Sequence, residues 1–290
     1  MRPLKDLFFE EYWEIAFRKY SENDTVVNGK GTYKFDILRA DKQFWYADPF
    51  LFKKNNRTFL FVEIFDNKTE KGIIGYSEFI DNHFTKPQPI IVENFHLSYP
   101  YVFEKDGNIY MMPETHEDGC VQLYRATDFP TKWTKDRILI NDINAADTVI
   151  ENDMIITSVV CPENDMSIDL VIYDQSLESC DYNPAYSKSL TKRGAGKVFT
   201  HREARIRPSQ SCENGQYGCK LFFNKIDQCD KNGYRENIVS EITPKNIEVN
   251  GKRIRGIHTY ARTSNLECVD VKSKKVNIFR LFYIIKRKLF

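Results

Sequence analysis

The chain has 290 residues, of which 41% are apolar and 29% are charged, so it can bury a full hydrophobic core. Its 42 Lys and Arg residues balance 41 Asp and Glu residues, for a net charge of +1. This balance excludes a global field that would recruit nucleic acid or a strongly acidic substrate, so any basic patch must be local.

The first thirty residues lack the apolar run of a secretory signal, and no run of about 18 apolar residues occurs in the chain. We therefore expect a cytoplasmic protein. The seven cysteines are irregularly spaced and form no CxxC pair, which argues against a disulfide framework and against a zinc site. We expect reduced thiols, no metal and no other cofactor.

The N-terminal part of the sequence contains a predicted strand, which is followed by a sequence repeat. Residues 11–19, EYWEIAFRK, have the aromatic and β-branched content of a strand. Residues 48–64 then align without a gap with residues 99–115, at an offset of 51 residues. Each copy holds an apolar run, a turn, a second apolar run and a glutamate, Glu63 or Glu114. This pattern predicts a β-hairpin in each copy, with Asp-Gly forming the turn of the second.

Further copies follow at the same spacing. An aromatic residue marks the third predicted strand of four copies, at Tyr76, Tyr124, Tyr173 and Phe223. The third copy opens near residue 145 with Asp147 in the place of Asp48, the fourth near residue 194 and a fifth near residue 256. A period of about 50 residues with three or four short strands per copy is typical of propeller blades. We expect an all-β, five-bladed β-propeller over residues 10–270, which the strand at residues 11–19 would close by pairing with the last blade.

The C-terminal tail, residues 271–290, breaks this pattern. Residues 272–290 carry seven Lys or Arg and no acid around a short apolar stretch. This composition predicts a short basic amphipathic helix that can lie on an anionic membrane surface. A helix packed on the side of the propeller is the alternative.

The repeat also indicates where chemistry would lie. Inner strands of a propeller line its axis, so Asp48, Tyr99 and Asp147, which recur at their starts, would lie near one another. Two carboxyl groups in one small volume cannot both ionise freely, and such a pair suits acid/base chemistry at a glycosidic bond. Alternatively, Asp48 orients the turn before Pro49, while Glu63 and Glu114 bind backbone N–H groups at blade edges.

The later repeats add polar candidates. The fourth offers groups that suit sugar hydroxyls, carboxylates or a phosphate, namely Arg205, Arg207, Ser209, Gln210 and Tyr217. His258 in the fifth copy can reach the same place, and Trp45 and Tyr46 can stack on a sugar ring. The alternatives are a solvated arginine face, a structural histidine and aromatic packing between blades. The chain has no Walker A, GxGxxG, GxSxG or HExxH motif.

The motifs resemble a known family. WYADPFLF, HLSYPYVFEKDGNIYMMPET, VQLYRATDFPTKW and RPSQSC resemble, in order, the propeller domain that precedes the transferase domain in plant glucosamine inositolphosphorylceramide transferase. Stand-alone bacterial relatives of that domain are often encoded among surface-polysaccharide genes. More distantly, ADP at residues 47–49 is similar to the first-blade motif of five-bladed hydrolases of the arabinanase and levansucrase kind. That similarity implies a base or nucleophile role for Asp48, whereas Tyr99 stands where those hydrolases often have an acid.

We therefore expect an enzyme that acts on a glycan or activated sugar during cell-surface polysaccharide assembly, by glycosyl transfer or by glycosidase-like chemistry. Asp48 and Glu114 would be the reacting pair, and Asp147 would tune them. The expected substrate-binding residues are Trp45, Tyr46, Glu63, Tyr99, Arg207, Gln210, Tyr217 and His258. The alternative is a non-catalytic glycan-binding or scaffold module that assists a partner glycosyltransferase.

Overall fold

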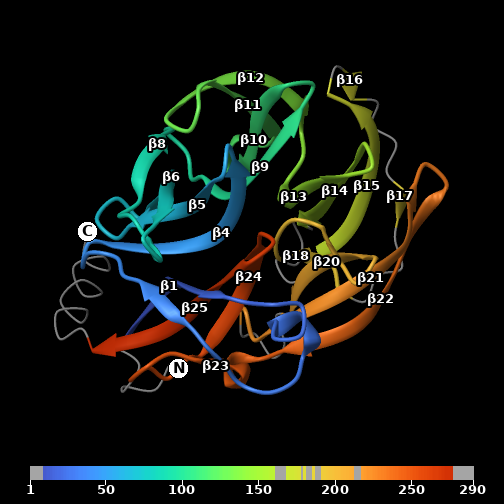
Figure 1. Ribbon diagram of the computed structural model, residues 1–290. Coiled ribbons are helices and arrows are strands. Elements are labelled where there is room, and N and C mark those ends of the chain that lie inside the picture. Colours follow the sequence, from blue (N-terminus) through green and yellow to red (C-terminus); the bar gives the residue numbers. More distant parts are fainter. Residues whose placement is uncertain are drawn as a thin grey trace, which may run out of the picture.

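The computed structural model describes residues 9–160, 168–177, 179–180, 185–186, 191–211 and 217–276. Within these residues, five antiparallel sheets stand around a common centre (Figure 1). This arrangement confirms the predicted all-β, five-bladed propeller.

Each blade is one of these sheets. Blade I consists of β4 (Phe44–Lys54), β5 (Arg57–Asp66), β6 (Lys71–Ile80), β7 (His83–Phe84) and β8 (Gln88–Ile91). Blade II consists of β9 (Ser98–Lys105), β10 (Asn108–Glu114), β11 (Val121–Asp128) and β12 (Lys132–Ile140). Blade III consists of β13 (Ala145–Glu151), β14 (Met154–Val160), β15 (Ile168–Ser176), β16 (Ser179–Cys180) and β17 (Ala185–Tyr186).

The last two blades are less regular. Blade IV consists of β18 (Arg193–Gly194), β19 (Phe199–His201), β20 (Ala204–Ser211), β21 (Lys220–Asp230) and β22 (Gly233–Ile242). Blade V consists of β24 (Gly256–Arg262), β25 (Leu266–Val276), β1 (Phe9–Lys19) and β3 (Asp36–Leu38). Outside the blades, the described residues also form a parallel strand pair and short 3-10 helices, namely β2 (Tyr33–Lys34), β23 (Ile247–Glu248), η2 (Val26–Asn28), η3 (His116–Asp118) and η5 (Pro244–Asn246).

Local sequence explains the hairpins. The turn between β4 and β5 places Asn55 and Asn56 at φ of 49° and 61°, and the turn between β9 and β10 places Asp106 and Gly107 at 50° and 74°. Two consecutive residues with positive φ are what a two-residue hairpin turn requires, and Asn, Asp and Gly tolerate that conformation best. Both predicted hairpins are confirmed.

The aromatic period also has a structural basis. Its four members lie on the third strands of blades I to IV, β6, β11, β15 and β21. Three of them, Tyr124, Tyr173 and Phe223, are at most 2% exposed and belong to the hydrophobic core. The repeat therefore records side chains that fill the same layer in successive blades.

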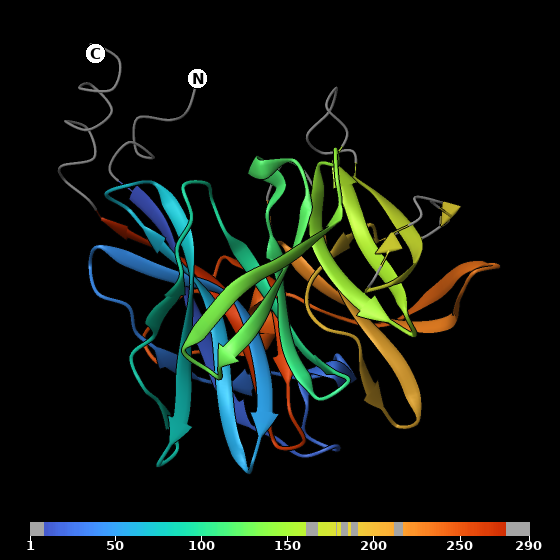
Figure 2. The same cartoon turned by 90° about the horizontal axis from the view of Figure 1, so that it is seen from above.

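The N-terminal strand closes the ring. β1 pairs with β25 along its whole length, from Phe9 opposite Val276 to Lys19 opposite Leu266. The blue β1 and the red β25 lie side by side in both views (Figures 1 and 2). The predicted pairing of residues 11–19 with the last blade is confirmed, and the outer strand of this blade is β3.

The prediction of a C-terminal helix is wrong for residues 272–276, because β25 continues to Val276. Its lysines face acids of β1: Lys274 lies 3.3 Å from Glu11, and Lys275 lies 3.6 Å from Glu10. Cross-strand pairing with an acidic strand at the other end of the chain therefore competes with the helical tendency of this basic segment. The rest of the predicted helix, residues 277–290, lies outside the described residues. Among the described residues, no helix has the length and apolarity to cross a bilayer.

Candidate functional site

The inner strands of the blades are interrupted at one level. In blades I, III and V, the inner strand (β4, β13 or β24) has two residues that do not pair with the second strand of the blade. In blade II, the register between β9 and β10 shifts at the equivalent place. These β-bulges hold Asp48, Tyr99 and Asp147 at φ of 50°, 49° and 55°. A bulge re-aims a side chain, and left-handed backbone is costly for a residue other than glycine. Three blades thus hold the recurrent position in the same strained conformation.

Asp48 is buried at this position, with 8% of its surface exposed. Its Oδ2 accepts a hydrogen bond from the Tyr99 N–H at 3.1 Å, and its Oδ1 accepts one from the Thr259 hydroxyl at 2.8 Å. Burial raises the pKa of Asp48 to about 7, although the charge of His258 opposes this rise. Asp48 can therefore gain or lose a proton near neutral pH.

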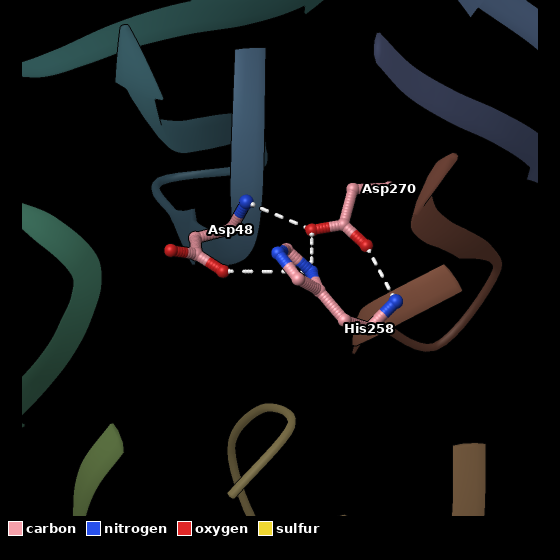
Figure 3. Close-up of side chains that lie close together, drawn as sticks. All are labelled: Asp48, His258 and Asp270. Atoms are coloured by element: carbon pink, nitrogen blue, oxygen red, sulfur yellow. Dashed lines mark hydrogen bonds and ion pairs between the residues drawn. The ribbon is translucent and has the colours of Figure 1, made fainter. Parts of the chain in front are cut away.

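Asp270 and His258 lie beside Asp48 (Figure 3). One oxygen of Asp270 accepts the Asp48 N–H at 3.1 Å, and the other accepts the N–H groups of His258 and Thr259 at 2.9 Å each. The same carboxylate pairs with Nδ1 of His258, which lies 3.9 Å from Asp48 Oδ1. The imidazole stacks on Trp13 with ring centroids 4.0 Å apart.

In the part of the chain that the structure describes, these three residues also form a group that could hold a metal ion, since one ligand atom from each lies within 4.8 Å of the others. Both oxygens of Asp270 already accept N–H donors, however. A cation would have to displace these bonds, so the donor set suits an imidazole better than a metal.

Asp147 lies in a different environment. Its Oδ2 accepts a hydrogen bond from Arg193 Nε at 2.6 Å, and its N–H donates to Glu114 Oε2 at 3.1 Å. Burial raises the pKa of Asp147 to about 6 in spite of Arg193. Burial would also raise the pKa of Glu114, but the imidazole of His116, 2.9 Å away, and Arg193 lower it below its usual value. His116 and Arg193 thus favour the charged form of Glu114, while its Oε2 binds the backbone of Asp147.

Two aromatic and cationic groups complete the site. The Arg193 guanidinium lies over the Tyr217 ring, 5.0 Å from its centroid, and the same ring meets His258 edge-on at 5.0 Å. Tyr217 has 36% of its surface exposed. We name this group the central cluster, and its members are Asp48, Glu114, Asp147, Arg193, Tyr217, His258 and Asp270.

Sequence reasoning missed Arg193 and Asp270. Arg193 stands at the start of the inner strand of blade IV, 46 residues after Asp147, so the repeat spacing was the signal that could have found it. Asp270 lies on the second strand of blade V, directly opposite the bulge, between Val269 and Val271 that pair with Tyr260 and Ile257. The weak similarity of the fifth copy concealed this position.

Other expected site residues lie in or beside the core. Tyr99 is 1% exposed, and its hydroxyl accepts the Gly196 N–H at 2.6 Å, so it spans from blade II to blade IV. Tyr46 is also 1% exposed, and burial raises its pKa to about 12. Trp45 stacks on Phe65 with centroids 4.3 Å apart.

The remaining three residues make protein contacts. Arg207 is 1% exposed and donates through Nε to Glu236 at 2.8 Å, so it stabilises the interior of blade IV. Gln210 Nε2 donates to the Gly194 carbonyl at 3.2 Å. Glu63 Oε1 lies 3.3 Å from Nε2 of His96. The structure thus brings Asp48, Glu114, Asp147, Tyr217 and His258 together and places Arg207 apart from them.

The comparison with known families agrees with this architecture. Residues 39–278 match the family described as glucosamine inositolphosphorylceramide transferase 1, N-terminal. The chain belongs to this family.

Curated relatives and solved structures extend the comparison. The chain is 32% identical over 203 residues to glucosamine inositolphosphorylceramide transferase 1 of Oryza sativa subsp. japonica and 31% identical to that of Arabidopsis thaliana. The match covers 66% of this chain but only 27% and 26% of those relatives, so the chain corresponds to about a quarter of their length.

Two of the similar solved structures are described as enzymes that act on glycosides. The catalytic domain of a Coprinopsis cinerea GH62 alpha-L-arabinofuranosidase is 11% identical, with a TM-score of 0.56 over 90% of this chain and 98% of that one. Another, described as a glycoside hydrolase, is also 11% identical, with a TM-score of 0.57 over 87% of this chain and 93% of that one. At this identity the likeness shows the fold, and the predicted resemblance to both groups is confirmed.

Proposed function

We propose that this protein binds a sugar at the central cluster and transfers a glycosyl group during assembly of a cell-surface polysaccharide. The observation that carries the proposal is a pair of buried carboxyl groups on matching bulges, whose pKa values burial raises to about 7 for Asp48 and about 6 for Asp147. An acid/base group is most effective when its pKa is near the working pH. Membership in a family named for a glycosyl transferase favours transfer over hydrolysis.

The neighbouring groups suit a sugar. The Tyr217 side chain is partly exposed, and Arg193 adds guanidinium N–H donors beyond the one bound to Asp147. A sugar hydroxyl between these groups and Asp48 would meet both donors and an acceptor. The proposal places this reaction in the cytoplasm, with the basic residues 277–290 near an anionic membrane that carries lipid-linked sugars.

Complementation of a deletion strain tests the proposal. Asp48→Asn keeps the shape of the side chain but removes its proton-transfer capacity, so it should abolish the polysaccharide while the purified protein keeps its fold by circular dichroism. Asp153→Asn is the matched control, because the Asp153 side chain is 82% exposed in a hairpin turn. Full polysaccharide production by Asp48→Asn would contradict the proposal.

A second candidate is a glycan-binding module that positions a partner glycosyltransferase. It is favoured by the engagement of Asp48 within the protein, since each of its two oxygens already accepts a hydrogen bond from the chain. This candidate predicts that Asp48→Asn restores the polysaccharide, whereas Tyr217→Ala, which removes a partly exposed side chain of the central cluster, does not.

A further inference from the structure

Asp270 is the most heavily bonded carboxylate of the central cluster. It has no exposed surface, and it accepts the N–H groups of Asp48, His258 and Thr259 at 2.9 to 3.1 Å. These bonds join β25 to the bulges of both β4 and β24. Asp270 therefore holds the backbone of β4 at Asp48 and the backbone of β24 at His258 in place.

The His258 side chain is oriented by the same carboxylate. Nδ1 faces Asp270, so this nitrogen carries the proton of the bond. Stacking on Trp13 and the edge contact with Tyr217 hold the ring in this orientation. The charged or titratable groups that face His258 are Asp48, Asp270, Arg193 and Tyr217.

The other ring nitrogen is open. No hydrogen bond joins Nε2 of His258 to the part of the chain that the structure describes, and Nε2 is not among its fully buried, unpartnered polar atoms. In Figure 3 the imidazole ring points toward the carboxyl group of Asp48. His258 and Asp48 are thus two proton-transfer groups beside one another, with Nδ1 of the imidazole 3.9 Å from Oδ1 of the carboxyl group.

Burial by itself lowers the pKa of His258, but the charge of Asp270 and its hydrogen bond, with the charge of Asp48, raise it above the usual value. The two carboxyl groups therefore favour the protonated form of the His258 imidazole. Glu114, the carboxyl group expected to form the reacting pair with Asp48, is instead engaged by His116 and by the backbone of Asp147.

We propose that Asp270 is a positioning residue that makes His258 the acid partner of Asp48. The reaction rests on the proposed function. The effect of Asp270 on where His258 holds its proton, and on its titration, does not depend on that function. His258 donates its Nε2 proton to the leaving oxygen as the bond from that oxygen to the sugar carbon breaks. Asp48 takes the proton of the acceptor hydroxyl as the new carbon–oxygen bond forms, and that proton then returns to His258.

Nitrogen NMR on the full-length, ¹⁵N-labelled protein tests this arrangement. The signals of His258 are assigned by their loss in His258→Gln. We expect neutral His258 to carry its proton on Nδ1, and we expect Asp270→Asn to lower its titration midpoint by about 1 to 3 pH units. Glu267→Gln is the matched control, because Glu267 is an equally buried acid on β25 that bonds Thr25 and Tyr260 instead.

Two results would overturn the inference. One is a neutral wild-type His258 with its proton on Nε2, which can be read even if Asp270→Asn does not fold. The other is a midpoint that Asp270→Asn leaves unchanged, or that Glu267→Gln lowers equally. If Asp48→Asn restores the polysaccharide while the NMR results are as expected, the proposed function fails and the proton arrangement stands.

Discussion

At the scale of single residues, the bulge position on the inner strand makes different contacts in different blades. Asp48 and Tyr99 share the strained bulge conformation, yet Asp48 accepts the N–H of Tyr99, whereas the Tyr99 hydroxyl accepts the N–H of Gly196 across the axis. Where blades I and III carry an acid at this position, blade II carries Tyr99, which forms a bond between blades II and IV. Asp48 therefore has a neutral tyrosine, and not a second negative charge, as its neighbour in blade II.

Stability against pH tests the state of Asp48. Its native pKa of about 7 lies above the ordinary value of 3.8, so the native protein holds a proton that the unfolded chain has lost. This contribution is complete below pH of about 4 and is lost as pH rises through 7. When the pH rises from 5 to 8, the free energy of unfolding should fall in wild type by roughly 1 to 3 kcal/mol more than it does in Asp48→Asn.

Urea unfolding at the two pH values measures this difference. Asp147 is present in both proteins, so its own contribution cancels in the comparison. The exposed-site variant Asp153→Asn should retain the wild-type dependence. Equal pH dependence in wild type and Asp48→Asn would show that Asp48 does not hold a proton near neutral pH.

At the scale of elements, the ring depends on close approach between inner strands. Gly196 lies between β18 and β19 at φ 135°, and a Cβ atom there would lie 2.0 Å from the Tyr260 carbonyl oxygen of β24. The neighbouring Ala195 carbonyl accepts the Tyr260 N–H at 2.7 Å. Blades IV and V therefore touch backbone to backbone, which only glycine permits at this point.

Two alanine substitutions separate this contact from backbone strain. Gly196→Ala adds strain and a clash, whereas Gly233→Ala, at φ 145°, adds strain in open space. We expect Gly196→Ala to lower the free energy of unfolding by about 1 to 3 kcal/mol more than Gly233→Ala does, as measured in urea. Equal losses would mean that blades IV and V do not meet at Gly196.

The elements that could be predicted are those encoded by local repeats. Hairpin turns, the third-strand aromatics and the recurrent Asp48 position all follow from short-range patterns. The partners could not be predicted, because they depend on contacts between distant segments. Glu114 binds the backbone of blade III, and Lys274 pairs with an acid of β1. Neither contact leaves a signal within a single repeat.

At the scale of the whole molecule, ring closure converts distant residues into one site. Trp13 of β1 stacks on His258. Asp270 of β25 accepts the N–H of Asp48, although 222 residues separate these two aspartates. The near-zero net charge leaves recognition to local groups. Binding at the central cluster is therefore the claim on which the account depends most.

Fluorine NMR of the protein labelled with 5-fluorotryptophan tests this claim most directly. The chain has three tryptophans, and Trp13 stacks on His258 in the central cluster, whereas Trp133 packs against Phe61 and Phe129 in blades I and II. Titration with oligosaccharides from the surface polysaccharide of the source organism should shift the Trp13 signal to saturation and leave Trp133 in place. The account is contradicted if these sugars do not bind, or if they bind and the Trp13 signal does not move.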